Sequence, residues 1–294
     1  MISMKNSTFR FLPFLAVIIT SIVVLFACQK EAKLDAVPEG KAKLSVYLTD
    51  GPLDFQHVWV DIQQIAVKVD TCRRHHDDDH WGPGCNDDHD SLSGRCEYWD
   101  TLAINPGVYD LLALRNGVDT LLASGFVING KIERIKFTLG TNNSLMVDSV
   151  THPINLINNQ TYVFVNVGRE HLDSISSNNF QLYLDFDLSR SIRYTGGQYW
   201  LKPYLKPFGR HSTGEIEGKV RPVHSHGLIK AYSDTDTAYA RPWDHEGEFK
   251  IRGLRPGTYS LFIDGINGYR DTTITNITVQ RGDDTKLGII RLQQ

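Results

Sequence analysis

The sequence lacks the short motifs of the common enzyme sites: it contains no GxSxG, SxxK, HExxH, P-loop or GxGxxG pattern. Convergent catalytic triads leave little trace in a sequence, so this lack lowers the expectation of an enzyme without removing it. An excess of positive charge is also lacking, because 31 lysines and arginines stand against 34 aspartates and glutamates, the formal net charge is −3, and no basic stripe occurs. Nucleic acid is therefore not expected as a partner. Long stretches with the 3.6-residue period of helices are missing too, which argues against an α/β sheet.

The first 27 residues have the features of a lipoprotein signal peptide. Lys5 and Arg10 form a basic start, and residues 11–27 form a nearly unbroken apolar run that ends in Leu25-Phe26-Ala27-Cys28. A leucine three residues before a cysteine, with a small residue between, is a lipobox, so we expect cleavage before Cys28 and a diacylglycerol on its thiol. The alternative is an uncleaved membrane anchor. It is disfavoured because the run is slightly shorter than the roughly 20 residues that span a bilayer.

Lipoprotein processing implies a bacterial cell envelope and a membrane partner reached through the lipid alone. Several acyl chains on one cysteine hold a protein stably, because each buried methylene contributes about 0.8 kcal/mol. Gln29 follows the cysteine where an aspartate would favour inner-membrane retention, so we expect the outer membrane. The sequence leaves open which face of that membrane the protein occupies.

Period-2 alternation of apolar residues dominates after a polar tether at 28–40. Such segments occupy 44–48, 58–62 and 65–69, and the third is one residue out of phase with the second, which predicts a β-bulge at Gln63-Gln64. Further strands are predicted at 135–139, 162–167, 180–186 and 199–207. Only 108–114 and 118–124 have the pattern of short helices. Many short strands with turn residues between them predict a β-sandwich.

Composition shifts to a polar, glycine-bearing stretch at 209–214, where we place a linker. The predicted organisation is a signal peptide at 1–27, a tether at 28–40, a sandwich at 41–208 with an insert at 71–98, and a second sandwich at 215–294. The second sandwich has about seven strands, including 215–220, 228–232, 248–251, 258–264, 272–279 and 285–292. The predicted fold class is therefore all-β, with two sandwiches of the immunoglobulin or transthyretin-like kind.

Four ordered blocks carry a family resemblance: LSVYLTDGPLDF (44–55), YDLLALRNGVDTLLASG (109–125), RIKFTLGTNNSLMVDS (134–149) and LYLDFDLSRSIRYTGGQYWLKP (182–203). Together they resemble the bacterial lipoprotein family known as domain of unknown function 4382. The resemblance implies an architecture and an envelope location, and no activity. The chain departs from the family pattern at 71–98, where a short hairpin is usual.

The C-terminal part is similar to the carboxypeptidase-regulatory-like, transthyretin-type sandwich through GEIEGKV (214–220) and GEFKIRGLRPGTYSLFIDG (247–265). In the second block, Phe249 and Ile251 are expected in the core, Pro256-Gly257 in a turn, and Tyr259 and Leu261 back in the core. Such modules are grouped with carbohydrate-binding-like folds. By this analogy alone, the expected partner is a glycan or another envelope protein.

The insert concentrates side chains that bind metals. Four of the eleven histidines lie within residues 75–89. Imidazole and carboxylate together suit zinc, copper or nickel, whereas a calcium-loop pattern is broken by Trp81. The candidate ligands are His75, His76, Asp77, Asp79, His80, Asp88, His89 and Asp90. The alternative is a solvated acidic loop with net charge −4 over residues 71–97, so no cofactor is certain.

Lipidation of Cys28 leaves Cys72, Cys85 and Cys96, an odd number in an oxidising compartment. Cys72 ends one predicted strand and Cys96 begins the next, so we favour a disulfide between them at the stem of a hairpin. Cys85 is then a free thiol or a soft metal ligand. Pairing through Cys85 is the open alternative.

Two carboxylate pairs, Asp185 with Asp187 and Asp50 with Asp54, have the spacing of an acid and a base on one strand face. Exposed carboxylates that hold loops or arginines are the favoured interpretation, since Phe186 between the first two is apolar. We therefore assign no catalytic residue.

Two further groups of residues are candidates for binding. His224 and His226 form a weaker metal candidate, and solvated histidines are the favoured interpretation. Six aromatic residues could stack on sugars, although ordinary cross-strand packing is more common: Trp59, Tyr98, Trp99, Tyr199, Trp200 and Trp243.

Three functional hypotheses follow. The first is a non-enzymatic, lipid-anchored binding or structural module, with carbohydrate as the suggested ligand. The second is a divalent-metal-binding envelope protein that uses the loop at 75–90. The third, least favoured, is a carboxylate-based hydrolase. The sequence does not specify the ligand or the oligomeric state.

Overall fold

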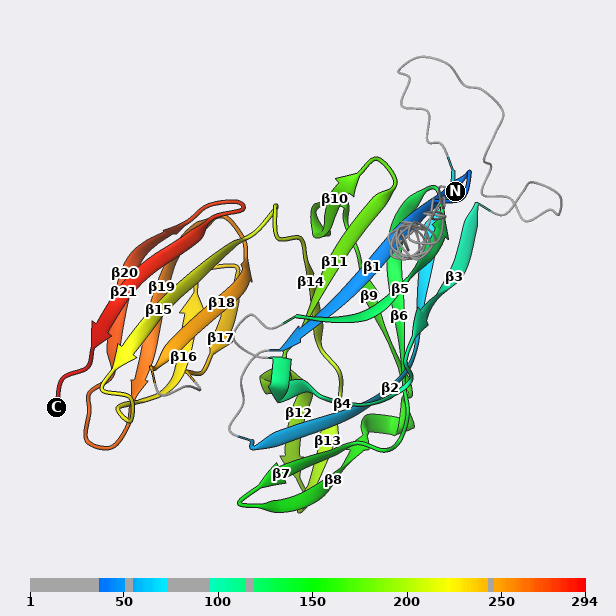
Figure 1. Ribbon diagram of the computed structural model, residues 1–294. Helices are drawn as coiled ribbons and strands as arrows, with labels where there is room; N and C mark the ends of the chain where they lie inside the picture. Colours follow the sequence, from blue (N-terminus) through cyan, green and yellow to red (C-terminus); the bar gives the residue numbers. More distant parts are fainter. Residues whose placement is uncertain (1–36, 51–54, 73–95, 115–118, 243–245) are drawn as a thin grey trace, which may run out of the picture. The chain divides into compact units, whose positions relative to one another are not determined.

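The protein is built mainly of β-strands, as the computed structural model in Figure 1 shows. The structure describes residues 37–50, 55–72, 96–114, 119–242 and 246–294. Two separate apolar clusters lie between β-sheets, so the all-β sandwich prediction is confirmed. Residues 37–294 form one compact unit. No helix in the described ranges is long and apolar enough to cross a membrane.

Within the described ranges, the first fourteen strands form one hydrogen-bonded array. They are β1 (Lys41–Asp50), β2 (His57–Asp70), β3 (Glu97–Ile104), β4 (Gly107–Asp110), β5 (Thr120–Ile128), β6 (Lys131–Leu139), β7 (Ser144–Val147), β8 (Val150–Leu156), β9 (Tyr162–Asn166), β10 (Leu172–Ser176), β11 (Asn179–Phe186), β12 (Ile192–Thr195), β13 (Gln198–Leu201) and β14 (Leu205–Phe208). The short helical turns are η1 (Leu111–Leu114), η2 (Ile157–Asn159), η3 (Arg169–His171) and α2 (Leu188–Ser191).

The first sandwich has two layers joined by β3. One layer has the order β10-β11-β1-β5, with β14 added to β11, and β1 runs parallel to β11. In the other layer, β2 pairs with β3, β4, β6 and β7. Because β3 pairs with β2 through its first residues and with β5 through Ala103 and Ile104, it passes from one layer to the other. The alternating apolar residues of both layers fill the shared core.

The phase slip in the sequence is a β-bulge in β2. The register between β2 and β6 shifts between Ile62 and Gln64, which confirms the prediction. The side chains of Ile62 and Ile65 are fully buried on either side of it, while Gln63 and Gln64 are exposed. The bulge thus keeps both apolar segments of β2 facing the same core.

The second sandwich has a three-stranded sheet, β18-β15-β21, and a four-stranded sheet, β17-β16-β19-β20. Phe249, Ile251, Tyr259 and Leu261 are all buried in its core, as the sequence predicted. The strands are β15 (Gly214–Arg221), β16 (His226–Tyr232), β17 (Thr237–Ala240), β18 (Glu248–Leu254), β19 (Gly257–Gly265), β20 (Thr272–Val279) and β21 (Asp284–Arg291).

Three local predictions were wrong or incomplete. The single strand predicted at 199–207 is two strands, β13 and β14, because the chain leaves the ladder around Pro203, which has no N–H to donate. Residues 120–124 of the helix predicted at 118–124 belong to strand β5, whose pairing with β1 and β3 overrides the local pattern. The helix predicted at 108–114 is only a helical turn, η1, because its first residues form β4. The sequence analysis also missed β7, β8, β10, β12 and β17, which have four to seven residues each and so show too little alternation to be recognised.

Residues 209–213, between β14 and β15, are held by hydrogen bonds. The Asp173 carboxylate accepts from the backbone N–H groups of Arg210, at 2.6 Å, and His211, at 3.0 Å, and its side chain is only 2% exposed. The Thr213 hydroxyl donates to the Gly209 carbonyl oxygen at 2.7 Å. The domain boundary placed here from the sequence stays a prediction.

Candidate functional sites

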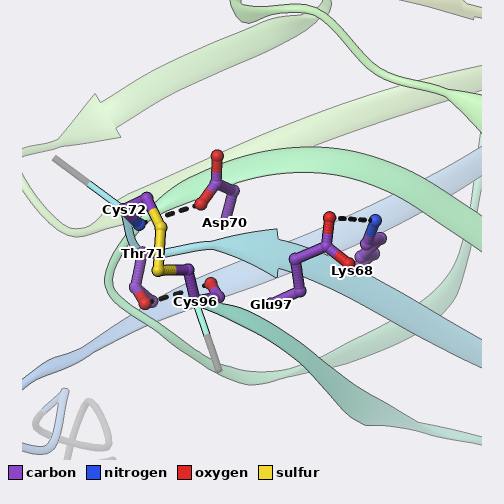
Figure 2. Close-up of a disulfide and its surroundings, with 6 residues drawn as sticks. All are labelled: Lys68, Asp70, Thr71, Cys72, Cys96 and Glu97. Carbon is purple, nitrogen blue, oxygen red and sulfur yellow. Dashed lines mark hydrogen bonds and ion pairs between the residues drawn. A yellow bond between two sulfur atoms is a disulfide. The ribbon is translucent and has the colours of Figure 1, made fainter. Parts of the chain in front are cut away.

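The Cys72–Cys96 disulfide closes the end of the β2–β3 hairpin (Figure 2). The two strands are antiparallel up to the pair Asp70 and Glu97, directly before the cysteines. The Cα atoms of the cysteines are 5.1 Å apart. The disulfide predicted from the sequence is therefore confirmed.

Polar contacts surround this disulfide. The Thr71 backbone N–H and hydroxyl both donate to the Cys96 carbonyl oxygen, at 2.7 and 3.1 Å. The Cys72 backbone N–H donates to Asp70 Oδ1 at 2.8 Å, and Lys68 Nζ lies 2.6 Å from Glu97 Oε1. The stem of the insert is thus fixed by the strand ladder, by side chains and by a covalent bond.

Several predicted residues lie outside the described ranges. These are the lipidation residue Cys28, the thiol of Cys85, Asp54, Trp243, the side chain of Asp50, and the metal candidates His75, His76, Asp77, Asp79, His80, Asp88, His89 and Asp90. Within the described ranges, no group of three or more histidine, cysteine, aspartate or glutamate side chains is arranged to hold a metal. The metal prediction stays a prediction.

Asp187 is a structural carboxylate. It is the N-cap residue of α2, and its Oδ1 accepts from the Arg190 backbone N–H at 3.0 Å and from the Ser189 hydroxyl at 2.6 Å. Phe186 beside it is fully buried. This agrees with the interpretation that the carboxylates hold a loop, although Asp187 does so through backbone and hydroxyl groups.

Asp185 has a different environment. The residue is half-buried, and its carboxyl lines a polar cleft of about 1200 Å³ and has no hydrogen-bond partner among the described residues. Burial raises the pKa of Asp185 to about 7, the charges of Asp187 and Asp236 act in the same direction, and Lys206 opposes them. Lys206 faces Asp185 across β11 and β14 and forms an ion pair with Asp236 at 2.7 Å. Sequence reasoning missed Lys206 and Asp236, because three distant segments meet here.

His226 is buried, so its prediction as a solvated histidine was wrong. Its residue is 8% exposed at the start of β16, and neither ring nitrogen has a hydrogen-bond partner among the described residues. Burial lowers the pKa of His226, and the nearby imidazole of His224 acts in the same direction. His224 itself is exposed, so the two histidines do not share an environment.

Of the five aromatic candidates within the described ranges, only Trp99 and Tyr98 are clearly exposed, at 47% and 43%. Trp59 is half-buried and stacks on His57 with ring centroids 4.8 Å apart. Tyr199 and Trp200 are half-buried as well. The sequence analysis missed Tyr162 and Phe164 in β9, each 43% exposed. The two residues are two positions apart in a predicted strand, so their side chains share one face. That spacing is the sequence signal that could have identified them.

The fold places the chain in the class of all-β sandwich proteins. Residues 41–203, more than half of the chain, match the family described as domain of unknown function, DUF4382, and the chain belongs to that family. No curated protein matches the chain significantly. The lipoprotein and carboxypeptidase-regulatory-like assignments stay predictions.

Among solved structures, the chain is similar to the minor pilin GBS52 of Streptococcus agalactiae, with 12% identity, 85% of this chain and 95% of that chain covered, and a TM-score of 0.22. It is also similar to the shaft pilin SpaA of Lactobacillus rhamnosus GG, with 9% identity, coverages of 86% and 97%, and a TM-score of 0.22. At these TM-scores, the likenesses carry no argument about function.

Replacing both Cys72 and Cys96 by serine is expected to lower the free energy of unfolding by about 3 kcal/mol, because the unfolded chain regains the freedom of the closed loop. Urea denaturation of the soluble form that begins at Gln29 measures this change. Cys85→Ser is the matched control and should leave stability unchanged. An equal loss in the control would mean that Cys85 takes part in the pairing in solution.

Asp185→Asn is expected to stabilise the protein increasingly as pH rises. The pKa of Asp185 is raised in the folded state, so the wild-type carboxylate lowers stability from about pH 4 to about pH 7. The difference in unfolding free energy between variant and wild type should widen over this interval and be constant above it. Urea denaturation from pH 4 to 9 measures this difference. The comparison variant Asp187→Ala should instead lower stability by about 1 kcal/mol, because it loses the helix cap. A pH-independent effect of Asp185→Asn would contradict this interpretation.

Proposed function

We propose that this protein is a non-enzymatic, lipid-anchored module of the bacterial cell envelope that binds carbohydrate. The observation that carries the anchoring is the lipobox, Leu25-Phe26-Ala27-Cys28, which a polar tether separates from the first strand, β1. Lipid on Cys28 would hold the protein at the outer membrane without any contribution from the folded part. The tether would leave the sheets free to meet a ligand.

The engagement of Asp187 supports a binding role over an acid and base pair. Asp187, one member of the acid and base pair raised by the sequence, is engaged as a helix cap. Exposed aromatic side chains on the outer faces of strands support carbohydrate as the ligand, because sugar rings stack their apolar faces on aromatic rings.

Cys28→Ala is expected to abolish lipid attachment and to move the protein out of the membrane fraction of a Gram-negative host. Mass spectrometry of the N-terminal peptide and membrane fractionation measure the two effects. Cys85→Ala serves as the control and should keep both properties. An uncut N-terminus in the wild-type protein, with membrane association kept by Cys28→Ala, would instead identify an uncleaved anchor.

Divalent-metal binding is the second candidate function. Its support is the disulfide at the stem of the insert, which closes a segment rich in histidine and aspartate. Ligands confined to one closed loop need less ordering to converge on an ion than ligands on a free chain. The loop would then be the functional element of the protein.

Zinc, copper or nickel is expected to bind near-stoichiometrically to the soluble form that begins at Gln29. Replacing His75, His76, His80 and His89 together by alanine should remove that binding in isothermal titration. The exposed His224 provides the control, since His224→Ala should bind as the wild type does. No metal uptake by the wild-type form would leave the insert as a solvated acidic loop.

A further inference from the structure

The outer face of four adjacent strands carries a group of exposed aromatic and cationic side chains. The strands lie in the order β3-β2-β6-β9. Val67, Ile135 and Val165, which are in register on β2, β6 and β9, point into the core and are buried. Their sequence neighbours therefore point to the opposite, solvent-facing side. We call this side the aromatic face and define it by Trp99, Arg134, Lys136, Tyr162 and Phe164.

Three rings on the aromatic face form a continuous row. The ring centroids of Trp99 and Phe164 are 6.0 Å apart, and those of Phe164 and Tyr162 are 5.4 Å apart. Although the three rings pack against one another, each of the three residues is still 43–47% exposed. Cross-strand packing accounts for the contacts but not for so much apolar surface left in water.

Two cations lie over these rings without a carboxylate partner among the described residues. The Arg134 guanidinium is 5.4 Å from the centre of the Phe164 ring, and Lys136 Nζ is 5.1 Å from the centre of the Tyr162 ring. The Arg134 Nε–H donates to a neutral acceptor, Asn166 Oδ1, at 3.0 Å. Positive charge on this face is therefore open to an external anion.

Lys68, on the same side of β2, shows the contrast. Its Nζ is 2.6 Å from Glu97 and 3.7 Å from Glu133, so its charge is already balanced. The unbalanced charge is concentrated beside Phe164 and Tyr162, at the β9 end of the aromatic row. A ligand that uses both features must offer flat apolar surfaces and negative charge at short intervals.

We propose that the aromatic face binds an anionic polysaccharide whose sugars carry carboxylate or sulfate groups. Sugar rings stack on Trp99, Phe164 and Tyr162, and the acidic groups pair with Arg134 and Lys136. This inference rests on the proposed carbohydrate binding. It adds which face of the protein binds the ligand and that the ligand is negatively charged. Single-stranded nucleic acid shares this chemistry, but two unpaired cations are few for a ligand with a phosphate on every unit.

The test measures binding of the full-length chain, purified in detergent, to polysaccharides immobilised on a biosensor. Polygalacturonate is the carboxylated probe, dextran sulfate the sulfated one, and highly methyl-esterified polygalacturonate has the same backbone with its charge removed. We expect binding to at least one anionic probe, at least tenfold weaker binding to the esterified one, and weakening with added salt. Polyglutamate and oligothymidylate are the non-sugar polyanions and should bind at least tenfold more weakly.

Trp99→Ala and Phe164→Ala are each expected to weaken binding of the anionic polysaccharide at least tenfold. Lys136→Gln should weaken it severalfold and reduce the salt dependence, while leaving the rings in place. Tyr194→Ala is the matched control, because Tyr194 is 65% exposed in β12, which is not one of the four strands. Circular dichroism establishes that each variant is folded, and Lys136→Gln keeps the test available if an aromatic variant fails to fold.

Anionic-polysaccharide binding that the three face variants leave unchanged would overturn the assignment of the face and leave carbohydrate binding standing. Equal binding of the charged and esterified probes would overturn the ligand charge. Tighter binding of oligothymidylate or polyglutamate would replace the polysaccharide by another polyanion. Failure to bind any polysaccharide would overturn this inference and the carbohydrate part of the proposed function together, without affecting lipid anchoring.

Discussion

The pairing of β2 along its whole length is the constraint on which the first sandwich depends. A strand of fourteen residues has to satisfy its backbone hydrogen bonds on both edges, and β2 does so with β4 and β7 near its start and with β3 and β6 near its end. The bulge at Gln63 lets both halves keep their apolar residues in one core. The disulfide stem follows the last residue of β2, and the aromatic face lies over its second half, so the register of one strand positions both.

Charged contacts connect regions that the apolar cores leave separate. Arg252 in β18 forms ion pairs with Asp119, at 2.7 Å, and with Glu215, at 3.2 Å, and each of the three side chains is at most 15% exposed. Breaking one partner of such a partly buried set leaves a charge without compensation, which costs more than the pair contributes. The carboxylate of Asp173 separately holds the segment between β14 and β15 through the backbone N–H groups of Arg210 and His211.

The sequence predicted the features that depend on neighbouring residues and missed those that depend on distant ones. Alternation located the cores of β1 and β2, the bulge at Gln63, and the return of Tyr259 and Leu261 to the second core. The position of Cys72 and Cys96 at strand ends was enough to pair them. Strand β5 looked helical, because its pairing with β1 and β3 is not visible locally. The environment of Asp185 was missed for the same reason, since Lys206 and Asp236 come from other segments.

The same reasoning explains why the aromatic row is a property of the sheet and not of any single strand. Neighbouring strands are about 4.8 Å apart, so β3 and β9, with β2 and β6 between them, are separated by roughly 14 Å. The rings of Trp99 and Phe164 are nevertheless only 6.0 Å apart, so both side chains lean inward over the intervening strands. Ala66, in register with Thr101 on one side and Lys136 on the other, offers only a methyl group on that path. A larger residue there would push the two rings apart. The continuity of the row therefore requires a small side chain on β2 as much as it requires the aromatic residues themselves.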